Sequence, residues 1–258
     1  MPTILRRARP LLLAAALSLG TLAPAGAQQA FSPEQRSAIE GIIKDYLVKN
    51  PEVLQEAIGE LEKRQAEAQK KAQSAALAQI REEVVSGKHG VVVGNAQGDV
   101  TLVEFFDYNC GYCKRALTDL RALMKADPKL RIVLRDLPVL GPDSIEAAKV
   151  AIAAKSQLSG DKVFEYHARL LEGRGRVGGE QAVALAKSMG LDMARLQRDL
   201  GGTDVQTTIA GNSTIAERLG MTGTPAYVVG QEVISGAVGA EPLRQAIEAA
   251  RKCGNASC

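Results

Sequence analysis

The sequence TLVEFFDYNCGYC, residues 101–113, holds the strongest structural signal in this chain. Its first half, residues 101–106, is apolar and rich in aromatic side chains, which is typical of a buried strand. The residues that follow it have a helical pattern. Cys110 and Cys113 therefore lie at a strand-to-helix turn. Two thiols this close can form and open a disulfide, so the sequence indicates redox chemistry.

The expected helix start favours a reactive thiolate at Cys110, because unpaired N–H groups and the positive end of the helix dipole lie there. Cys113, one turn further, is placed to resolve a mixed disulfide. A static disulfide and half of a zinc site are the alternatives, and zinc usually takes four ligands. The other candidate ligands are His89, His167, Cys253 and Cys258. Haem attachment would need His after the second cysteine, where this chain has Lys114.

Residues 1–27 have the features of a secretory signal peptide. Three arginines form a basic start, an apolar run covers residues 11–22, and residues 25–27 read Ala-Gly-Ala. The apolar run is too short to span a bilayer. We therefore expect this segment to be removed and the mature chain to be exported to the periplasm, where disulfides can persist.

The charge balance argues against nucleic-acid binding. The chain has 32 Lys and Arg and 29 Asp and Glu, and three of the arginines lie in the expected signal peptide, which leaves 29 of each sign. A mature chain near neutrality without Trp offers neither a basic surface nor a stacking platform for bases. We expect no nucleic-acid partner.

Residues 28–90 are expected to form a helical stalk that ends in a hinge at residues 87–90. Ser32-Pro33-Glu34-Gln35 has the features of a helix start. Asn50-Pro51 ends this helix and begins a second one that runs to about Ser86. The apolar seam of the second helix consists of Leu54, Ile58, Leu61, Ala68, Ala72, Ala75 and Ile80.

A seam this narrow needs a partner, because helix propensity alone stabilises an isolated helix little. We expect the partner to be another copy of the chain, so that residues 31–86 form a homo-oligomer. The alternative is that the helix packs along its own catalytic domain.

Residues 91–252 are expected to form an α/β domain. The strand-like runs are residues 91–93, 101–106, 130–134, 226–229 and 232–234. A helical insertion at about residues 140–220 interrupts the sheet, and a last helix reaches residue 252. Residues 253–258 form a tail that contains Cys253 and Cys258. We expect these two to pair as a disulfide, and a Cu(I) clamp is the alternative because thiolates suit that ion.

Three segments together resemble the DsbA-like thioredoxin-fold proteins: residues 104–114, Phe164-Glu165-Tyr166-His167 and Gly223-Thr224-Pro225-Ala226-Tyr227. The resemblance covers about residues 95–250 and implies a thioredoxin fold with a helical insertion. Residues 31–90 resemble the N-terminal stalk of ScsC-type copper-sensitivity suppressors. Some of those are trimers with disulfide isomerase activity, so the resemblance implies a homotrimer here.

The resemblance also implies roles for residues around the cysteine pair. Thr224-Pro225 would contain a cis peptide bond that faces the cysteines and exposes the Thr224 backbone to an extended substrate. An ordinary trans turn is the alternative. Glu104 would lie beneath the site, with its pKa raised by burial, and relay protons to Cys113. The alternative for Glu104 is a strand-edge charge that reaches solvent.

Gly111 and Tyr112 refine the expected function and belong, with Thr224 and Pro225, to the expected substrate-binding residues. Oxidising members of the family have Pro-His between the cysteines, and the cation helps to hold the thiolate. Gly-Tyr lacks that cation, which implies a less oxidising pair. Together with Thr before the proline it resembles the bacterial disulfide isomerases.

We therefore expect a periplasmic disulfide isomerase that acts on misoxidised exported proteins. A membrane thiol reductase of the DsbD or ScsB kind would keep it reduced, and it needs no cofactor beyond its cysteine pair. The alternatives are a monomeric DsbA-like dithiol oxidase, a Cu(I)-binding copper-tolerance protein and a structural oligomer that acts through its stalk.

Overall fold

The computed structural model describes residues 31–258, so the expected signal peptide lies outside the described residues. The chain divides into two compact units, one that ends at Gly59 and one from Glu60 to Cys258. Within residues 31–258, no helix is both long and apolar enough to cross a membrane.

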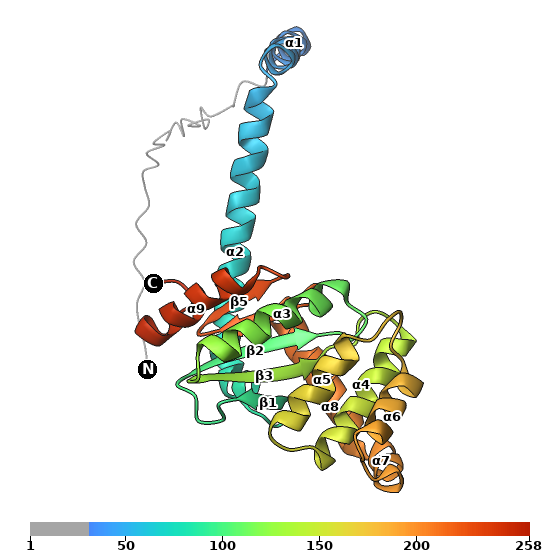
Figure 1. Ribbon diagram of the computed structural model, residues 1–258. Coiled ribbons are helices and arrows are strands. Elements are labelled where there is room, and N and C mark those ends of the chain that lie inside the picture. The colour runs from blue at the N-terminus through green and yellow to red at the C-terminus, as the bar shows by residue number, and fades with distance from the viewer. Residues whose placement is uncertain (1–30) are drawn as a thin grey trace, which may run out of the picture. The chain divides into compact units, whose positions relative to one another are not determined.

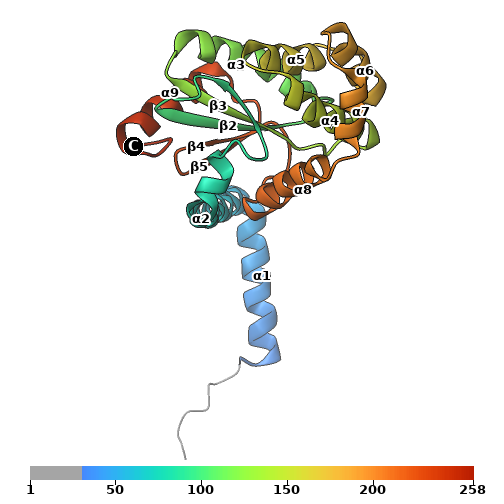
Figure 2. The same ribbon diagram turned by 90° about the horizontal axis from the view of Figure 1, so that it is seen from below.

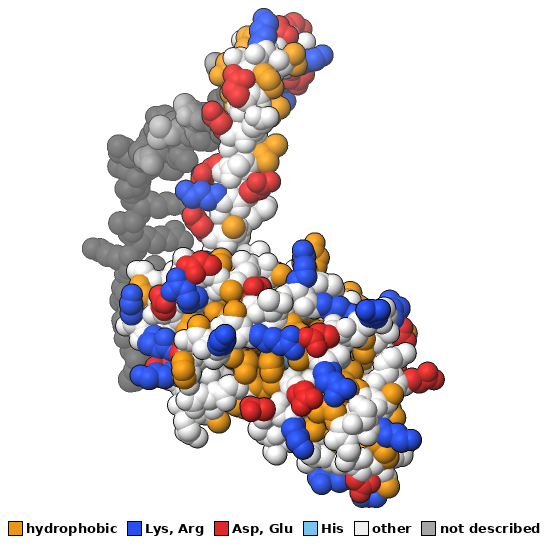
Figure 3. All heavy atoms as spheres, in the orientation of Figure 1, with side chains coloured by type: hydrophobic (Ala, Val, Ile, Leu, Met, Phe, Trp, Pro, Cys, Tyr) orange, Lys and Arg blue, Asp and Glu red, His pale blue; other side chains and the backbone are white. Residues whose placement is uncertain are grey.

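The first unit contains helix α1 (Pro33–Lys49) and the first residues of helix α2 (Glu52–Val85). Ser32 and Gln35 form a capping box at the start of α1, and Asn50 caps its end by donating to the Tyr46 carbonyl. No residue of α1 is buried. Its exposed apolar side chains lie among charged ones, as Figure 3 shows. They are Ile39, Ile42, Ile43, Tyr46 and Val48.

The second unit is built on a five-stranded sheet (Figure 1). Its strands are β1 (Val91–Gly94), β2 (Val100–Phe106), β3 (Leu130–Asp136), β4 (Ala226–Val229) and β5 (Glu232–Ser235). The order is β1-β3-β2-β4-β5, in which only β2 and β3 run parallel. The strands expected from the sequence are confirmed to within two residues at their ends, and the α/β thioredoxin-like fold is confirmed with them.

Strand β2 divides the apolar core between the two faces of the sheet. Leu102 and Phe106 pack with helix α3 (Gly111–Ala126) and helix α9 (Ala240–Cys253). Val103 and Phe105 pack on the other face, against α2 and helix α8 (Thr203–Arg218). Figure 2 shows α3 on one face of the sheet and α8 on the other. Successive side chains of β2 thus lie in two different cores, which explains why this strand contains almost no polar residue.

The expected helical insertion lies between β3 and β4 and is confirmed. It consists of α4 (Pro142–Ala154), a 3₁₀ turn (Lys155–Gln157), α5 (Asp161–Leu171), α6 (Gly179–Ser188), α7 (Met193–Leu200) and α8. Helix α4 packs against α6, α7 and α8. Alanine fills five of its positions, and these small side chains allow the surrounding helices to approach closely.

The structure corrects the expected seam of α2. Residues 60–90 group with the α/β unit, because Leu77, Ile80 and Val84 are buried in the core beneath Val103 and Phe105. Ile80 therefore packs on its own chain, whereas Leu54, Ile58 and Leu61 remain exposed. The intramolecular alternative holds for the last third of the helix.

Two arginines of β3 hold the end of α2. The buried Arg135 donates to the carbonyls of Glu83, Val84 and Ser86, at 2.9 Å for Val84 and 3.0 Å for Ser86. Arg131 donates to the Val85 carbonyl at 2.7 Å. Positive charge at a helix C-terminus is stabilising, and these bonds satisfy carbonyls that lack helical partners. The segment expected to be a hinge thus follows a helix end fixed by side-chain bonds.

Candidate active site

The cysteine turn connects β2 to α3, as the sequence predicts. Cys110 is the N-cap residue of α3 with an extended backbone, and its sulfur accepts a hydrogen bond from the backbone N–H of Cys113 at 3.4 Å. Gly111 and Tyr112 are exposed, and the guanidinium of Arg115 lies 4.5 Å from the centre of the Tyr112 ring. Both cysteines are free thiols in the structure.

The Cys110 thiol is strongly acidic. A hydrogen bond with the Cys113 thiol, together with bonds from Thr224 and from the backbone N–H groups of Cys113 and Tyr112, lowers the pKa of Cys110 to about 5, although burial acts in the opposite direction. Cys110 is therefore a thiolate at neutral pH. The absence of a cation between the cysteines was expected to leave the thiolate less stabilised, but the Cys113 thiol, Thr224 and the N–H groups at the helix N-terminus together stabilise it.

Cys113 has the opposite character. Its side chain is fully buried, and the hydrogen bond to Cys110 together with burial raises the pKa of its thiol far above the ordinary value. The neighbouring Glu104 carboxylate adds to this effect. The turn thus presents one thiolate and one protonated thiol. This is the arrangement that thiol–disulfide exchange requires of an attacking and a resolving sulfur.

Glu104 lies on the same face of the sheet as this pair. The side chain is 2% exposed on the central strand β2, so the alternative of a strand-edge charge in solvent is contradicted. Burial raises the pKa of Glu104 to about 8, and Cys110 and Asp119 add to the shift. In the β2–β4 ladder Glu104 lies directly opposite Tyr227, whose pKa is also raised by burial. Tyr227 is a site neighbour that the sequence did not reveal, because strand register is set by non-local pairing.

Thr224 and Pro225 lie directly beside Cys110. The Thr224–Pro225 peptide bond is cis, as the resemblance implies. The Cys110 sulfur lies 3.1 Å from the carbonyl oxygen of Thr224, so the backbone of this segment borders the thiol. Of the residues predicted for the site, the structure brings Glu104, Cys110, Cys113 and Thr224 together.

Asp107 and Asn109 are site neighbours for which the sequence argument assigned no role. The buried Asp107 carboxylate accepts from the backbone N–H groups of Val139 at 2.8 Å and Leu140 at 3.0 Å, and from the Ser144 hydroxyl at 2.7 Å. Asn109 binds the backbone of Val177 in the insertion. A polar residue directly before a cysteine turn is the only sequence signal that marks either one.

The other candidate metal ligands do not converge on the cysteines. His167 is a packed core residue, with its ring 4.5 Å from that of Phe106, and burial lowers the pKa of His167 to about 3. Within the described part of the chain, no three His, Cys, Asp or Glu side chains form a group able to hold a metal ion.

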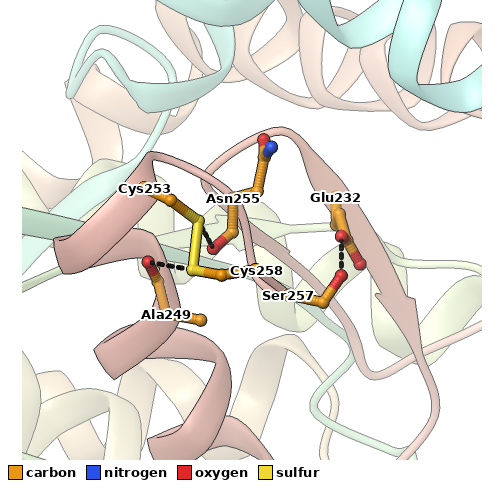
Figure 4. Close-up of a disulfide and its surroundings, with 6 residues drawn as sticks. All are labelled: Glu232, Ala249, Cys253, Asn255, Ser257 and Cys258. Carbon is orange, nitrogen blue, oxygen red and sulfur yellow. Dashed lines mark hydrogen bonds between the residues drawn. A yellow bond between two sulfur atoms is a disulfide. The ribbon is translucent and has the colours of Figure 1, made fainter.

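The C-terminal cysteines form a separate feature. Cys253 and Cys258 are joined as a disulfide, which confirms the expected pairing. Figure 4 shows this bridge at the end of α9, next to the hydrogen bond of 2.5 Å that Ser257 donates to Glu232 in β5. A Cβ atom on Gly230 would lie 2.4 Å from the carbonyl oxygen of Gly254, so the tail packs closely on the β4–β5 turn.

Residues 101–248, more than half of the chain, match the family model of the DSBA-like thioredoxin domain. The chain belongs to this family. Residues 35–68 match the Copper resistance protein ScsC N-terminal domain. The resemblance to a DsbA-like domain behind an ScsC-type N-terminal segment is therefore confirmed.

Solved structures agree with the family assignment. A thioredoxin-like oxidoreductase from Silicibacter pomeroyi DSS-3 is 39% identical and aligns with a TM-score of 0.63 over 67% of this chain and 98% of its own. Proteus mirabilis ScsC in a transitional conformation is 26% identical, with a TM-score of 0.62 over 86% of this chain and 98% of its own. The second alignment therefore extends beyond the DSBA-like domain itself.

The curated relatives are longer proteins. The Na(+)/H(+) antiporter NhaA 1 of Salinispora arenicola is 29% identical over 161 residues, which cover 62% of this chain and 24% of the relative. The chain thus spans about a quarter of the length of the curated relatives it matches.

Proposed function

We propose that this protein is a periplasmic thiol–disulfide oxidoreductase that acts as a disulfide isomerase on misoxidised exported proteins. The observation that carries the proposal is the opposed pair of thiols at the start of α3, with the pKa of Cys110 lowered to about 5 and that of Cys113 raised. Membership of the DSBA-like family and the name of the Silicibacter relative, an oxidoreductase, support this reaction class.

In the proposed reaction, the Cys110 thiolate attacks one sulfur of a wrong substrate disulfide. That disulfide breaks, one of its sulfurs forms a mixed disulfide with Cys110, and its other sulfur is released as a free thiolate while the substrate stays bound to the enzyme. A second substrate thiolate then attacks the mixed disulfide, which forms the new bond and regenerates the Cys110 thiolate without net oxidation. If no substrate thiol arrives, Cys113 attacks instead and releases a reduced substrate. The resulting Cys110–Cys113 disulfide would need two electrons from a membrane thiol reductase.

Glu104 is proposed to take the proton of Cys113 when Cys113 attacks the mixed disulfide. Cys113 must lose a proton to attack, and its thiol is fully buried. With a pKa of about 8, the Glu104 carboxyl exchanges protons near neutral pH, where a general acid–base group is most effective. Its raising effect on the pKa of Cys113 supports direct electrostatic coupling between the two groups.

The substrate chain is proposed to lie beside Cys110 along Thr224 and Pro225, over Gly111 and Tyr112. The Thr224 carbonyl is 3.1 Å from the attacking sulfur and can accept from a backbone N–H of an extended peptide. Gly111 has no atom within 4 Å of a would-be Cβ, and Tyr112 is 59% exposed. The surface around the thiolate is therefore open to a polypeptide.

The isomerase assignment depends on the N-terminal segment. Its apolar side chains, including Leu54, Ile58 and Leu61, are exposed to solvent, which is unfavourable for a lone helix. The ScsC-type match over residues 35–68 covers these positions. We propose that they form a homo-oligomeric stalk, as a trimer. Several thiolates around one substrate raise the effective thiol concentration for reshuffling.

One observation favours a second candidate, a dithiol oxidase. The stabilised Cys110 thiolate belongs to the reduced form, and stabilising the reduced form makes a dithiol pair more oxidising. In this reading the stalk does not matter, and the pair donates its disulfide to reduced substrates.

Refolding of a scrambled disulfide substrate decides between the two. The mature chain and a variant without residues 28–59 should be compared, because this deletion leaves the core residues Leu77, Ile80 and Val84 in place. If the protein is an isomerase that needs its oligomer, the full chain refolds the substrate. The shortened variant is then a monomer by light scattering and does not refold it. An oxidase instead oxidises a reduced substrate equally well in both forms. Failure of the full chain to refold the scrambled substrate would reject the isomerase.

A further inference from the structure

The loop of residues 173–177, between α5 and α6, touches the cysteine turn on both sides. On the N-terminal side, the Asn109 carboxamide accepts from the backbone N–H of Val177 at 2.7 Å and donates to its carbonyl at 2.9 Å. On the C-terminal side, the Lys114 ammonium donates to the carbonyls of Gly173 at 2.8 Å and Gly175 at 3.2 Å. The residue before Cys110 and the residue after Cys113 thus hold one loop.

We propose that Asn109 and Lys114 are positioning residues that clamp this loop to the cysteine turn and thereby hold Cys110 where its sulfur meets the N–H of Cys113. The proposal deepens the proposed function and rests on it. It gives the helical insertion a role in the redox site, although residues 173–177 contribute none of the expected site residues.

The contact of Asn109 belongs to a closed circuit of hydrogen bonds. Its amide group donates to the Ser144 hydroxyl at 3.0 Å, Ser144 donates to Asp107 at 2.7 Å, and Asp107 accepts from the backbone N–H of Asn109 at 2.7 Å. Ser144, Asp107 and Val177 are all buried. Hydrogen bonds in such surroundings are strong, and breaking one leaves a buried group without a partner.

The loop is shaped for the contact with Lys114. Gly175 has φ +71°, a left-handed conformation that other residues adopt only with strain. A Cβ atom on Gly173 would lie 2.9 Å from the Val177 side chain. The two glycines therefore allow the tight turn that directs two carbonyl oxygens at a single ammonium group. Arg176 also forms an exposed salt bridge of 2.7 Å with Asp143 at the start of α4.

The clamp lies directly next to the bond that stabilises the thiolate. Asn109 immediately precedes Cys110, whose extended N-cap backbone aims its sulfur at the N–H of Cys113. If the hydrogen bonds between Asn109 and Val177 are lost, the backbone directly before Cys110 can move. The Cys110 sulfur then meets the N–H less often, and its thiolate is less favoured.

The test uses Asn109→Ala and Lys114→Met in the full chain, with Lys114→Arg as the conservative change. Asn95→Ala and Lys149→Met are matched controls, because both side chains are exposed and bond elsewhere. Three properties are measured: amide hydrogen exchange at residues 173–177, the pH titration of the Cys110 thiolate absorbance, and the equilibrium with glutathione.

We expect exchange in the loop to accelerate about tenfold in Asn109→Ala and Lys114→Met. The titration midpoint of Cys110 should rise by about half a pH unit, a threefold loss of thiolate acidity, and the glutathione equilibrium should move toward the disulfide form. Because Asn109→Ala changes no charge, such a shift cannot be a Coulomb effect of Lys114. Lys114→Arg should restore both properties, and the controls should match the wild type.

Faster exchange with an unchanged midpoint would overturn the proposal, because the contact would then hold the loop without acting on Cys110. Unchanged exchange would overturn it too. Neither measurement needs a substrate. If the wild type failed to reshuffle disulfides, the proposed function would fail while the clamp could still be confirmed.

Discussion

The Cys110 sulfur and the Thr224 carbonyl oxygen lie 3.1 Å apart, although 114 residues separate them in the chain. The helical insertion fills most of that interval and returns the chain to the sheet at β4. The Thr224 side chain also lowers the pKa of Cys110 and so favours the thiolate. The residue that borders the substrate path in the proposed reaction therefore also tunes the attacking sulfur.

The substitution Thr224→Val should weaken the thiolate. Valine keeps the shape of threonine but lacks the hydroxyl group, so the hydrogen bond that lowers the pKa of Cys110 is lost. We expect the titration midpoint of Cys110 to rise by about half a unit to one unit. Ultraviolet absorbance of the thiolate against pH measures this. Thr207→Val, on α8, is the control, because its hydroxyl bonds only to the Thr203 carbonyl. An unchanged midpoint would mean that Thr224 acts through its carbonyl alone.

The substitution Glu104→Gln should change the pH dependence of stability. Burial raises the pKa of Glu104 from 4.5 to about 8, so between these values the folded chain keeps a proton that the unfolded chain has released. The free energy of unfolding therefore falls with rising pH in this window, by up to about 1.4 kcal/mol per pH unit. Glutamine does not titrate. The variant should gain stability relative to the wild type from pH 5 to pH 8.

Cys110 contributes the opposite slope in the reduced protein. Its folded pKa of about 5 lies below the ordinary value of 9.0, so its contribution to stability grows as pH rises from 5 to 9. Urea unfolding of the reduced wild type should thus vary little with pH, whereas Glu104→Gln should become more stable as pH rises. Glu165→Gln, an exposed change on α5, is the control. If the free energy of unfolding changed with pH in the same way in Glu104→Gln and in the wild type, the raised pKa of Glu104 would be wrong.

The sequence predicted the strands and the position of the cysteine pair because both depend on local patterns. Residues 101–106 are apolar throughout apart from Thr101 and Glu104, and the change to a helical period after Cys113 marks the turn. The register of β2 against β4 was not predictable, since it depends on pairing across the insertion. Consequently Tyr227 was not recognised as the residue opposite Glu104.

The last third of α2 shows a different limit. Leu77, Ile80 and Val84 recur at spacings of three and four residues, as do the exposed apolar positions earlier in the helix. The period of a stripe does not reveal what covers it. The burial of these three residues beneath β2 and the carbonyl contacts of Arg135 and Arg131 show that this end of the helix is held by its own domain.

Substitution of two leucines of α2 by alanine should therefore have different effects. Leu77 is completely buried, so Leu77→Ala should lower the free energy of unfolding by about 2–5 kcal/mol. Leu61 is 54% exposed, so Leu61→Ala should change it by less than about 0.5 kcal/mol in the monomer. Under the proposed assembly, Leu61→Ala should instead weaken self-association. Denaturant unfolding and light scattering measure the two effects. If both variants lost the same free energy of unfolding, the division of the helix between core and stalk would be wrong.

The tail disulfide should matter for stability and not for disulfide exchange. Cys253 and Cys258 close a small ring that packs on the β4–β5 turn, and a loop of this size limits the entropic stabilisation to about 2 kcal/mol. The double variant Cys253→Ser/Cys258→Ser should therefore unfold slightly more easily and refold scrambled substrate at the wild-type rate. Cys110→Ser is the comparison, and it should abolish refolding. If the tail variant instead lost refolding activity, or lost a Cu(I) ion that the reduced wild type binds, the tail would be a second functional site and the purely structural role would be wrong.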